Sequence, residues 1–250
     1  MAEPMRVAVC GARGRMGSET VRAISDAPDL RLVAGIDQGD DLATILRETR
    51  PAAMVDFTVP DVVLENIRTA LAQRVVPIVG TTGFSPDDLN EVRSLCETHG
   101  TGCLIAPNFA IGALLMMRFA AEAARYLPDV EILEMHHERK VDAPSGTAVK
   151  TAEMIATARE GGPVPAPEPV DAFEKFVGSR GGKAAGDIRI HSVRLPGFVA
   201  SQEVIFGGAG QRLSIRHDSI DRASFMPGVL LALRRSASVT GLVYGLENLL

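Results

Sequence analysis

The stretch RVAVCGARGRMG, residues 6–17, decides how the first part of this chain folds. Its apolar run Arg6–Cys10 predicts a buried strand, and the glycines that follow lead into a predicted helix. A strand, a glycine turn and a helix in succession bring backbone N–H groups to the positive end of a helix dipole, where they can bind a pyrophosphate. The spacing is GxxGxxG rather than the commoner GxGxxG, so the stretch predicts a dinucleotide site that needs support from its surroundings.

The alternation of strand and helix continues through the first hundred residues. Continuous apolar runs of this length are typical of parallel strands that are buried on both faces. The predicted strands are Arg6–Cys10, Arg31–Ile36, Ala53–Phe57, Pro77–Gly80 and Cys103–Ala106. The predicted helices cover residues 15–27, 60–73, 86–99 and 111–126. This pattern indicates βαβ units around a parallel sheet.

The pattern changes beyond residue 126. Strands in direct succession indicate a mixed or antiparallel sheet, accompanied here by one helix at about residues 147–159. These strands are predicted at Val130–Met135, Ile188–Val193, Ser201–Phe206 and Arg212–His217. The tail from Pro227 to Leu250 again has helical character. The sequence therefore predicts an α/β protein with a Rossmann-like parallel-sheet domain and a central α+β domain. The Pro/Gly-rich residues 161–186 are predicted either to close over a substrate or to be disordered.

Composition argues against several classes of protein. The chain carries 26 Lys and Arg against 31 Asp and Glu, a net charge of −5, which argues against a nucleic-acid binder. The longest apolar region, Phe109–Ala124, contains Arg118 and Glu122 and is too short to span a bilayer. We expect no targeting segment, no membrane contact and a cytoplasmic protein. The three cysteines are too few for a disulfide framework and lack the spacing of a zinc site.

Residues at the ends of the predicted strands support a dinucleotide site. Asp37 ends the second strand, 20 residues after Gly17, where a carboxylate can bind the hydroxyls of the adenosine ribose. Gln38 stands where an Arg could meet the 2′-phosphate of NADPH, which favours NADH. Arg13 and Arg15 lie inside the glycine loop and could reach a phosphate, so NADPH stays open. Later strand ends, at Asp56–Thr58, Gly80–Phe84 and Ala106–Phe109, could pack beside a nicotinamide ring.

The stretch EMHHERKVDAPSGTA, residues 134–148, carries residues suited to proton transfer. His136 and His137 are adjacent on a predicted strand, so they point to opposite faces and we expect no metal site. Lys140 shares the parity of His136, and the two offer a proton donor and a positive charge for an anionic substrate. Pro144–Thr147 opens a helix, whose N–H groups and dipole can bind a carboxylate. The stretch predicts a pocket in which a small carboxylate takes part in proton transfer.

These motifs, in this order, resemble those of a known family. GARGRMG, DFTVP, GTTGF, APNFAIG, the histidine–lysine stretch and HDSIDRASFMPGVLLA are similar to motifs of the dihydrodipicolinate reductases, or 4-hydroxy-tetrahydrodipicolinate reductases, of bacterial lysine biosynthesis. The resemblance covers nearly the whole chain, and the histidine–lysine stretch is its most specific part. It implies that NADH or NADPH reduces the cyclic dicarboxylate 4-hydroxy-2,3,4,5-tetrahydrodipicolinate to tetrahydrodipicolinate, with release of water.

The resemblance also implies an assembly and a domain arrangement. The family forms homotetramers. Residues 1–109 with 218–250 correspond to its Rossmann-like dinucleotide-binding domain, and residues 110–217 to its substrate-binding and oligomerisation domain.

Individual residues match the motif positions of the family. The resemblance implies that His136 is the acid/base residue and that Lys140 is the second proton donor. Substrate-binding positions are implied at His137, Ser145, Gly146 and Thr147. Cofactor-binding positions are implied at Gly11, Ala12, Arg13, Gly14, Arg15, Met16, Asp37, Phe57, Gly80, Thr81, Thr82, Ala106, Pro107, Asn108 and Phe109. One departure is Glu138–Arg139, where some members carry a third histidine before the lysine.

Three other functions fit parts of the sequence. The nearest is another NAD(P)-dependent dehydrogenase of the same architecture, acting on a small amino acid; Lys140 and the SGT carboxylate site argue against it only modestly. A cofactor-sensing regulator that binds DNA is disfavoured by the acidic charge. A catalytically silent binding module is disfavoured by the His136 and Lys140 pair. The roles of Arg180, Lys183 and His191 stay open.

Overall fold

The computed structural model describes residues 3–160 and 174–250 and divides the chain into two compact units. The first unit comprises Met1–Ala110 and Arg222–Leu250, and the second comprises Ile111–Asp221. The first unit therefore takes its residues from both ends of the chain. Each unit is described by itself below.

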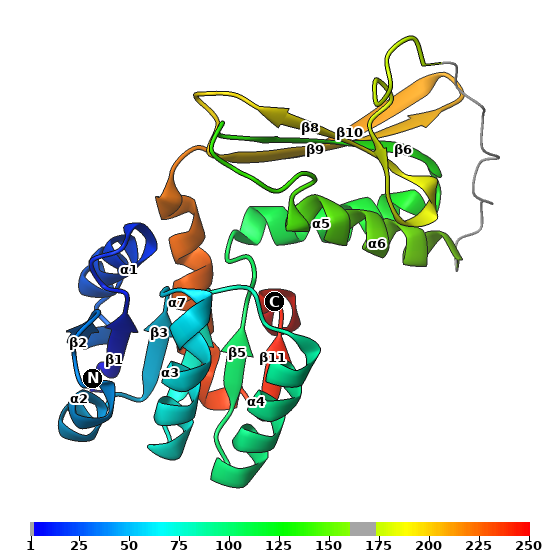
Figure 1. Ribbon diagram of the computed structural model, residues 1–250. Coiled ribbons are helices and arrows are strands. Elements are labelled where there is room, and N and C mark those ends of the chain that lie inside the picture. Colours follow the sequence, from blue (N-terminus) through cyan, green and yellow to red (C-terminus); the bar gives the residue numbers. More distant parts are fainter. Residues whose placement is uncertain (1–2, 161–173) are drawn as a thin grey trace. The chain divides into compact units, whose positions relative to one another are not determined.

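The first unit is built on a six-stranded parallel sheet (Figure 1). The strand order is β11-β5-β4-β3-β1-β2, and every neighbouring pair is parallel. The strands are β1 Met5–Cys10, β2 Leu30–Ile36, β3 Ala53–Asp56, β4 Val76–Val79, β5 Cys103–Ile105 and β11 Leu242–Tyr244. Because all the strands run the same way, their carboxyl ends meet at one edge of the sheet, where ligands bind in open α/β folds.

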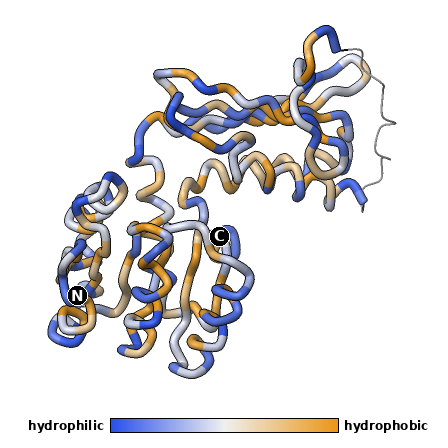
Figure 2. The backbone as a smooth tube through the Cα atoms, in the orientation of Figure 1, coloured by the Kyte–Doolittle hydropathy of each residue, from blue (hydrophilic) through white to orange (hydrophobic). Residues whose placement is uncertain are grey.

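Helices cover both faces of this sheet. They are α1 Arg15–Asp26, α2 Leu42–Thr49, α3 Pro60–Ala72, α4 Pro86–His99 and α7 Met226–Arg235. On one face, α3 and α4 bury Ile67 and Val92 against Val79. Alternate residues of the strands, such as Val9 and Leu104, are equally buried beneath the other face, where α1 and α7 contact each other. Hydrophobic residues accordingly follow the strands of this unit (Figure 2).

Local signals explain where α4 begins. The Ser85 hydroxyl accepts a hydrogen bond from the Asp88 N–H, and the Asp88 carboxylate accepts one from the Ser85 N–H. This reciprocal capping satisfies two backbone donors that the helix would otherwise leave unpaired. Pro86 at the first helical position completes the start predicted from the sequence.

Two elements of this unit differ from the sequence expectation. The helix α2 was not predicted, although Asp41 caps it by accepting from the Thr44 N–H. The tail predicted to be helical is α-helical only in α7, and short 3₁₀ helices follow at Ser236–Ser238 and Leu246–Leu249. Between these two, β11 adds a sixth strand beside β5. The run Leu242–Tyr244 is too short to separate from helix by periodicity, and its place in the sheet comes from pairing with a strand far away in the sequence.

The second unit is a five-stranded mixed sheet of order β10-β9-β6-β8-β7, with two helices (Figure 1). Its strands are β6 Asp129–His136, β7 Gly182–Lys183, β8 Arg189–Arg194, β9 Ala200–Gly208 and β10 Gln211–Ser219. The helices α5 Ile111–Ala124 and α6 Gly146–Glu160 pack against each other and cover one face of the sheet, over buried Ile132 and Phe206. The predicted fold class, a parallel-sheet Rossmann-like domain with a second mixed-sheet domain, is confirmed.

The Pro/Gly-rich segment predicted at 161–186 is only partly described. Residues 161–173 lie outside the described residues, so the choice between a closing loop and a disordered one is not decided. Residues 174–181 form turns that lead into the short strand β7. Within residues 3–160 and 174–250, none of the helices has the length and apolar character needed to cross a membrane.

Candidate active site

In the first unit, the predicted cofactor residues gather at the carboxyl edge of the parallel sheet. The glycine loop follows β1, Asp37 follows β2, Phe57 follows β3, Gly80–Thr82 follows β4 and Ala106–Phe109 follows β5. These five strands are neighbours in the sheet. The fold therefore brings together residues that lie as far apart in the sequence as the glycine loop and Phe109.

The glycine loop has the close backbone packing that a pyrophosphate site needs. Gly11 has a φ of +74°, and a Cβ there would lie 2.6 Å from the carbonyl oxygen of Phe57. At Gly17, in the first turn of α1, a Cβ would lie 1.9 Å from the carbonyl oxygen of Gly11. A side chain at Gly11 would push the loop away from the segment after β3, and one at Gly17 would push α1 away from the loop. The residues present therefore fit a dinucleotide whose phosphates lie at the N-terminus of α1.

A cavity of about 370 Å³ adjoins the loop. Its lining residues come from α1 and from the segments after β3 and β4: Arg15, Met16, Phe57, Thr58, Pro60, Gly80, Thr81 and Thr82. The Phe57 and Phe109 rings meet edge to face, with centroids 5.7 Å apart. A Cβ at Gly80 would lie 2.0 Å from the Phe57 ring, so glycine there allows the ring its position. The cavity offers an apolar wall and hydroxyl groups of the kind that a nicotinamide ring requires.

Asp37 lies beside the glycine loop. Both of its carboxylate oxygens accept from the Arg13 N–H, at 3.1 and 3.2 Å, and the Arg13 guanidinium lies 3.5 Å away. The Gly11 N–H and the Ala12 N–H both donate to the carbonyl oxygen of Ile36, which ties the loop to the end of β2. The Arg13 side chain is 89% exposed, so a ligand can reach it from solvent.

Asp56 supports the walls of this cavity, and the sequence alone gave it little weight. Its side chain is fully buried at the end of β3, and it accepts from the hydroxyls of Thr58 and Thr81 and from the amide of Asn66. These bonds join the segments after β3 and β4 to α3. Asp56 thus shapes the cavity without lining it. The sequence signal for this role was the position of Asp56 in the motif Asp56–Phe57–Thr58, at the end of a predicted strand.

The last predicted cofactor segment, Ala106–Phe109, continues from β5. The Ala106 N–H donates to the carbonyl oxygen of Val79, which holds the segment against the end of β4. The Asn108 side chain accepts from the Ala110 N–H at 2.8 Å and so stabilises the turn.

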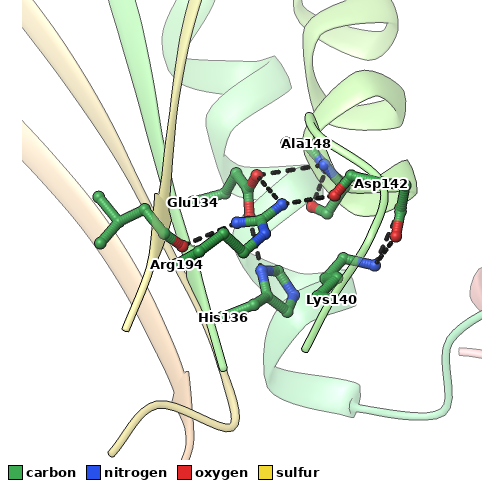
Figure 3. Close-up of polar contacts among 8 residues, drawn as sticks. Glu134, His136, Lys140, Asp142, Ala148 and Arg194 are labelled. Atoms are coloured by element: carbon green, nitrogen blue, oxygen red, sulfur yellow. Dashed lines mark hydrogen bonds and ion pairs between the residues drawn. The ribbon is translucent and has the colours of Figure 1, made fainter. Parts of the chain in front are cut away.

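In the second unit, the site is organised around Glu134 (Figure 3). Glu134 and His136 lie on one face of β6, and Arg194 lies beside His136 in the parallel register of β6 and β8. The Nδ1 atom of His136 is 2.5 Å from Glu134 Oε2, and Arg194 donates to both Glu134 oxygens, at 3.0 and 2.8 Å. The Ser145 N–H also points to Glu134 Oε1, at 3.3 Å. The sequence reasoning assigned no role to Glu134 or Arg194.

Lys140 belongs to the same network by a route that the sequence reasoning did not predict. The strand ends at His136, and the Lys140 N–H closes a turn by donating to the carbonyl oxygen of His137. The argument from shared strand parity with His136 is therefore wrong. Lys140 Nζ donates to both oxygens of Asp142, at 2.7 and 2.9 Å, and Arg194 donates to the Asp142 carbonyl oxygen at 2.7 Å. The turn and these bonds connect Lys140 to the Glu134 cluster.

The SGT residues begin α6 beside this cluster. The Ser145 hydroxyl accepts from the Ala148 N–H at 3.3 Å and so caps the helix. A Cβ at Gly146 would meet no atom within 4 Å, which leaves open space at the first turn. His137 directly follows β6. The second unit thus places an imidazole, an ammonium group and a helix N-terminus in one bonded network, as a small carboxylate substrate requires.

The residues whose roles stayed open lie elsewhere in the second unit. His191 pairs with Leu133 in the register of β6 and β8, which puts it on the face opposite Glu134. Its Nε2 lies 2.7 Å from Glu131, which also forms an ion pair with Arg180. Lys183 pairs with Asp187. In the described part of the chain, His, Cys, Asp and Glu side chains form no group of three or more that could hold a metal ion.

Comparisons with known proteins agree across the whole chain. The family profile "Dihydrodipicolinate reductase, N-terminus" matches residues 5–109, and "Dihydrodipicolinate reductase, C-terminus" matches residues 112–250. A 4-hydroxy-tetrahydrodipicolinate reductase from Desulfitobacterium hafniense is 51% identical, over 98% of each chain.

Solved structures show the same relationship. A dihydrodipicolinate reductase from Paenisporosarcina sp. TG-14, bound to dipicolinate, superposes with a TM-score of 0.87 at 41% identity, over 99% of this chain and 100% of the other. An amine dehydrogenase from Mycobacterium smegmatis superposes with a TM-score of 0.63 at 13% identity, over 98% of this chain and 96% of the other. At that identity the second likeness concerns the fold alone.

Proposed function

The chain belongs to the dihydrodipicolinate reductase family, and we propose that His136 is the residue that moves the proton in its reaction. The activity is that of a 4-hydroxy-tetrahydrodipicolinate reductase, an oxidoreductase that uses a nicotinamide dinucleotide. The solved relative binds dipicolinate, which supports a cyclic dicarboxylate as the substrate here. Another amino-acid dehydrogenase is not favoured, because dehydrogenases of that kind share only the fold with this chain.

One observation carries the proposal for His136. Its imidazole stands at the end of β6, bonded to a buried carboxylate that also contacts the backbone at the start of α6. A carboxylate substrate bound at the N-terminus of α6 would therefore lie next to a residue that can donate a proton. Among the described residues, no other histidine has a side chain bonded into the network that holds Lys140 and the start of α6.

The roles of the site residues follow from the needs of the reaction. The glycine loop, Asp37 and the Phe57 cavity would hold the nicotinamide dinucleotide, which would supply a hydride to ring C4 of the substrate once the 4-hydroxyl has left as water. His136 donates the proton that the reduced ring then takes up. The Lys140 ammonium group, held by Asp142 in this structure, would pair instead with a substrate carboxylate, and it is the second group of the site that can donate a proton. The α6 N-terminus, with Gly146 and Thr147, orients the ring through its dipole.

Substitution of His136 tests this proposal. We expect His136→Ala to lower kcat by about 10²-fold or more, because general acid catalysis typically contributes that much. Substrate can be generated from pyruvate and aspartate semialdehyde by the preceding synthase, with NADH and NADPH oxidation followed in parallel. NADH binding, measured by fluorescence, should be unchanged in the variant. His99→Ala, in α4, is the matched control and should retain activity. A fully active His136→Ala enzyme would show that another group moves the proton.

We also propose a preference for NADH, a homotetrameric assembly and a cytoplasmic location. The preference is supported by Asp37 and Gln38 at the end of β2, where a carboxylate suits ribose hydroxyls and repels a 2′-phosphate. The assembly is supported by the likeness to the family. Sedimentation velocity of the full chain would give the mass, and a monomer would exclude the tetramer.

A further inference from the structure

Glu134 is a buried carboxylate with an unusual set of donors. Its side chain is 0% exposed, although it is charged, and it lies in a β-strand among hydrophobic residues. The imidazole of His136 and two guanidinium nitrogens of Arg194 point to its two oxygens (Figure 3). The N–H of Ser145 donates to one of them, Oε1. A buried carboxylate that loses its partners costs much free energy. The donors around Glu134 therefore hold its carboxylate in one position.

The charge state of Glu134 determines what His136 can do. Burial alone would raise the pKa of the Glu134 carboxyl, but hydrogen bonds from His136 and Arg194 outweigh it and lower the pKa to about 2. The group is ionised at neutral pH. An ionised carboxylate can only accept hydrogen bonds. In the 2.5 Å contact with Oε2, the proton must therefore lie on Nδ1 of His136.

The position of that proton sets the chemistry of the other ring nitrogen. When Nδ1 of an imidazole is protonated and bonded, Nε2 is the atom that exchanges a proton with a ligand. A carboxylate behind a catalytic histidine also fixes the tautomer and the plane of the ring, as in the catalytic triads of hydrolases. Arg194 balances the charge of Glu134 and holds it from β8, so the carboxylate cannot turn away from the histidine.

We propose that Glu134 is a positioning residue, which holds His136 in the Nδ1-protonated tautomer and directs Nε2 to the substrate. This inference rests on the proposed role of His136 as the proton-transfer residue. Arg194 acts one step further back by fixing Glu134, and Ser145 couples the same carboxylate to the start of α6. The group that moves the proton and the helix that binds the substrate carboxylate therefore share one anchor.

The tautomer can be measured without any activity assay. We expect solid-state ¹⁵N NMR of the full chain, labelled at histidine and kept at a pH where imidazoles are neutral, to show His136 protonated at Nδ1 and bare at Nε2. The His136→Ala variant identifies the signal. A His136 ring protonated at Nε2 with a bare Nδ1 would overturn the inference. Because this measurement uses the unaltered protein, it decides the matter even if variants at Glu134 fail to fold.

Kinetics of Glu134→Gln supply the second test. We expect kcat to fall by about 10²-fold while KM for the dicarboxylate changes by less than about threefold, because a misplaced acid affects the transition state more than binding. The matched control is Glu131→Gln, which removes a carboxylate that also contacts a histidine and an arginine but lies on the opposite face of β6. It should retain kcat.

The outcomes separate this inference from the proposed function. A loss of kcat in Glu134→Gln that is absent from Glu131→Gln supports the positioning role. If Glu134→Gln keeps full kcat while His136→Ala is inactive, the positioning role is wrong and the proposed function stands. If Glu134→Gln and His136→Ala both stay active, the assignment of His136 as the proton-transfer residue is itself wrong.

Discussion

Asp37 is the residue on which the choice between two dinucleotides depends. Its carboxylate accepts from the Arg13 backbone N–H and faces the end of β2, where an adenosine ribose would lie. We expect Asp37→Ala to raise KM for NADH by about tenfold and KM for NADPH much less, because hydrogen bonds to a charged group typically contribute about 1.5–3 kcal/mol. Steady-state kinetics with both cofactors would measure this. Equal changes for both would contradict a ribose contact. Arg13→Ala is the reciprocal variant and should weaken the binding of NADPH more than the binding of NADH.

Glu134 also links the site to acid stability. The pKa of its carboxyl is about 2 in the folded chain and 4.5 ordinarily, so the folded state binds the proton less readily than the unfolded state. Its contribution, about 3 kcal/mol, is therefore complete above pH 4.5 and is lost as the pH falls toward 2. We expect the difference in free energy of unfolding between the native chain and Glu134→Gln to shrink over that range.

Urea unfolding at a series of pH values would measure that difference. Glutamine does not titrate, so the other acidic groups affect both proteins alike and cancel. A difference that stays constant from pH 7 to pH 3 would show that Glu134 is not held ionised by its partners.

At this scale the sequence could identify the residues that carry chemistry but not those that support them. His136, Lys140 and the SGT residues stand in one motif, so they could be named together. Arg194 is 60 residues from Glu134, and only the pairing of β6 with β8 brings them into contact. No local pattern encodes that pairing.

At the scale of elements, prediction succeeded where the signal was local. The parallel strands were predictable from continuous apolar runs, and α4 from its capping residues. The short helix α2 and the strand β11 were missed. The first has only eight residues, and the second has three. Elements that short are stabilised by tertiary contacts rather than by their own sequence.

The turn after β6 is a second place where a local pattern did not predict the structure. Parity along a strand predicts which side chains share a face only while the strand lasts. Because β6 ends at His136, Lys140 is placed by a turn and by its ion pair with Asp142 instead. His136 and Lys140 do belong to one network, but through tertiary contacts that strand periodicity does not predict.

At the scale of the molecule, the chain returns to its starting unit. Residues 222–250 pack with residues 1–110, although more than a hundred residues of the second unit separate them in the sequence. The return is tight: a Cβ at Gly228 in α7 would lie 2.0 Å from the carbonyl oxygen of Phe109 and 2.9 Å from the Leu246 side chain. The C-terminal segment is therefore part of the core that supports the Ala106–Phe109 segment.

Substitution of Leu246 tests whether the first unit depends on the C-terminal segment for its stability. Its side chain is 0% exposed, whereas Leu250, four residues later, is 47% exposed. We expect Leu246→Ala to lower the free energy of unfolding by about 2–5 kcal/mol, the usual cost of removing a buried leucine side chain. Leu250→Ala should change it by less than about 0.5 kcal/mol. Urea unfolding of the two variants makes the comparison. Since Leu246 packs near Phe109, weaker NADH binding should accompany the loss of stability only in Leu246→Ala. Equal stability of the two variants would mean that the last residues are an appendage, and that the first unit is complete without the returning segment.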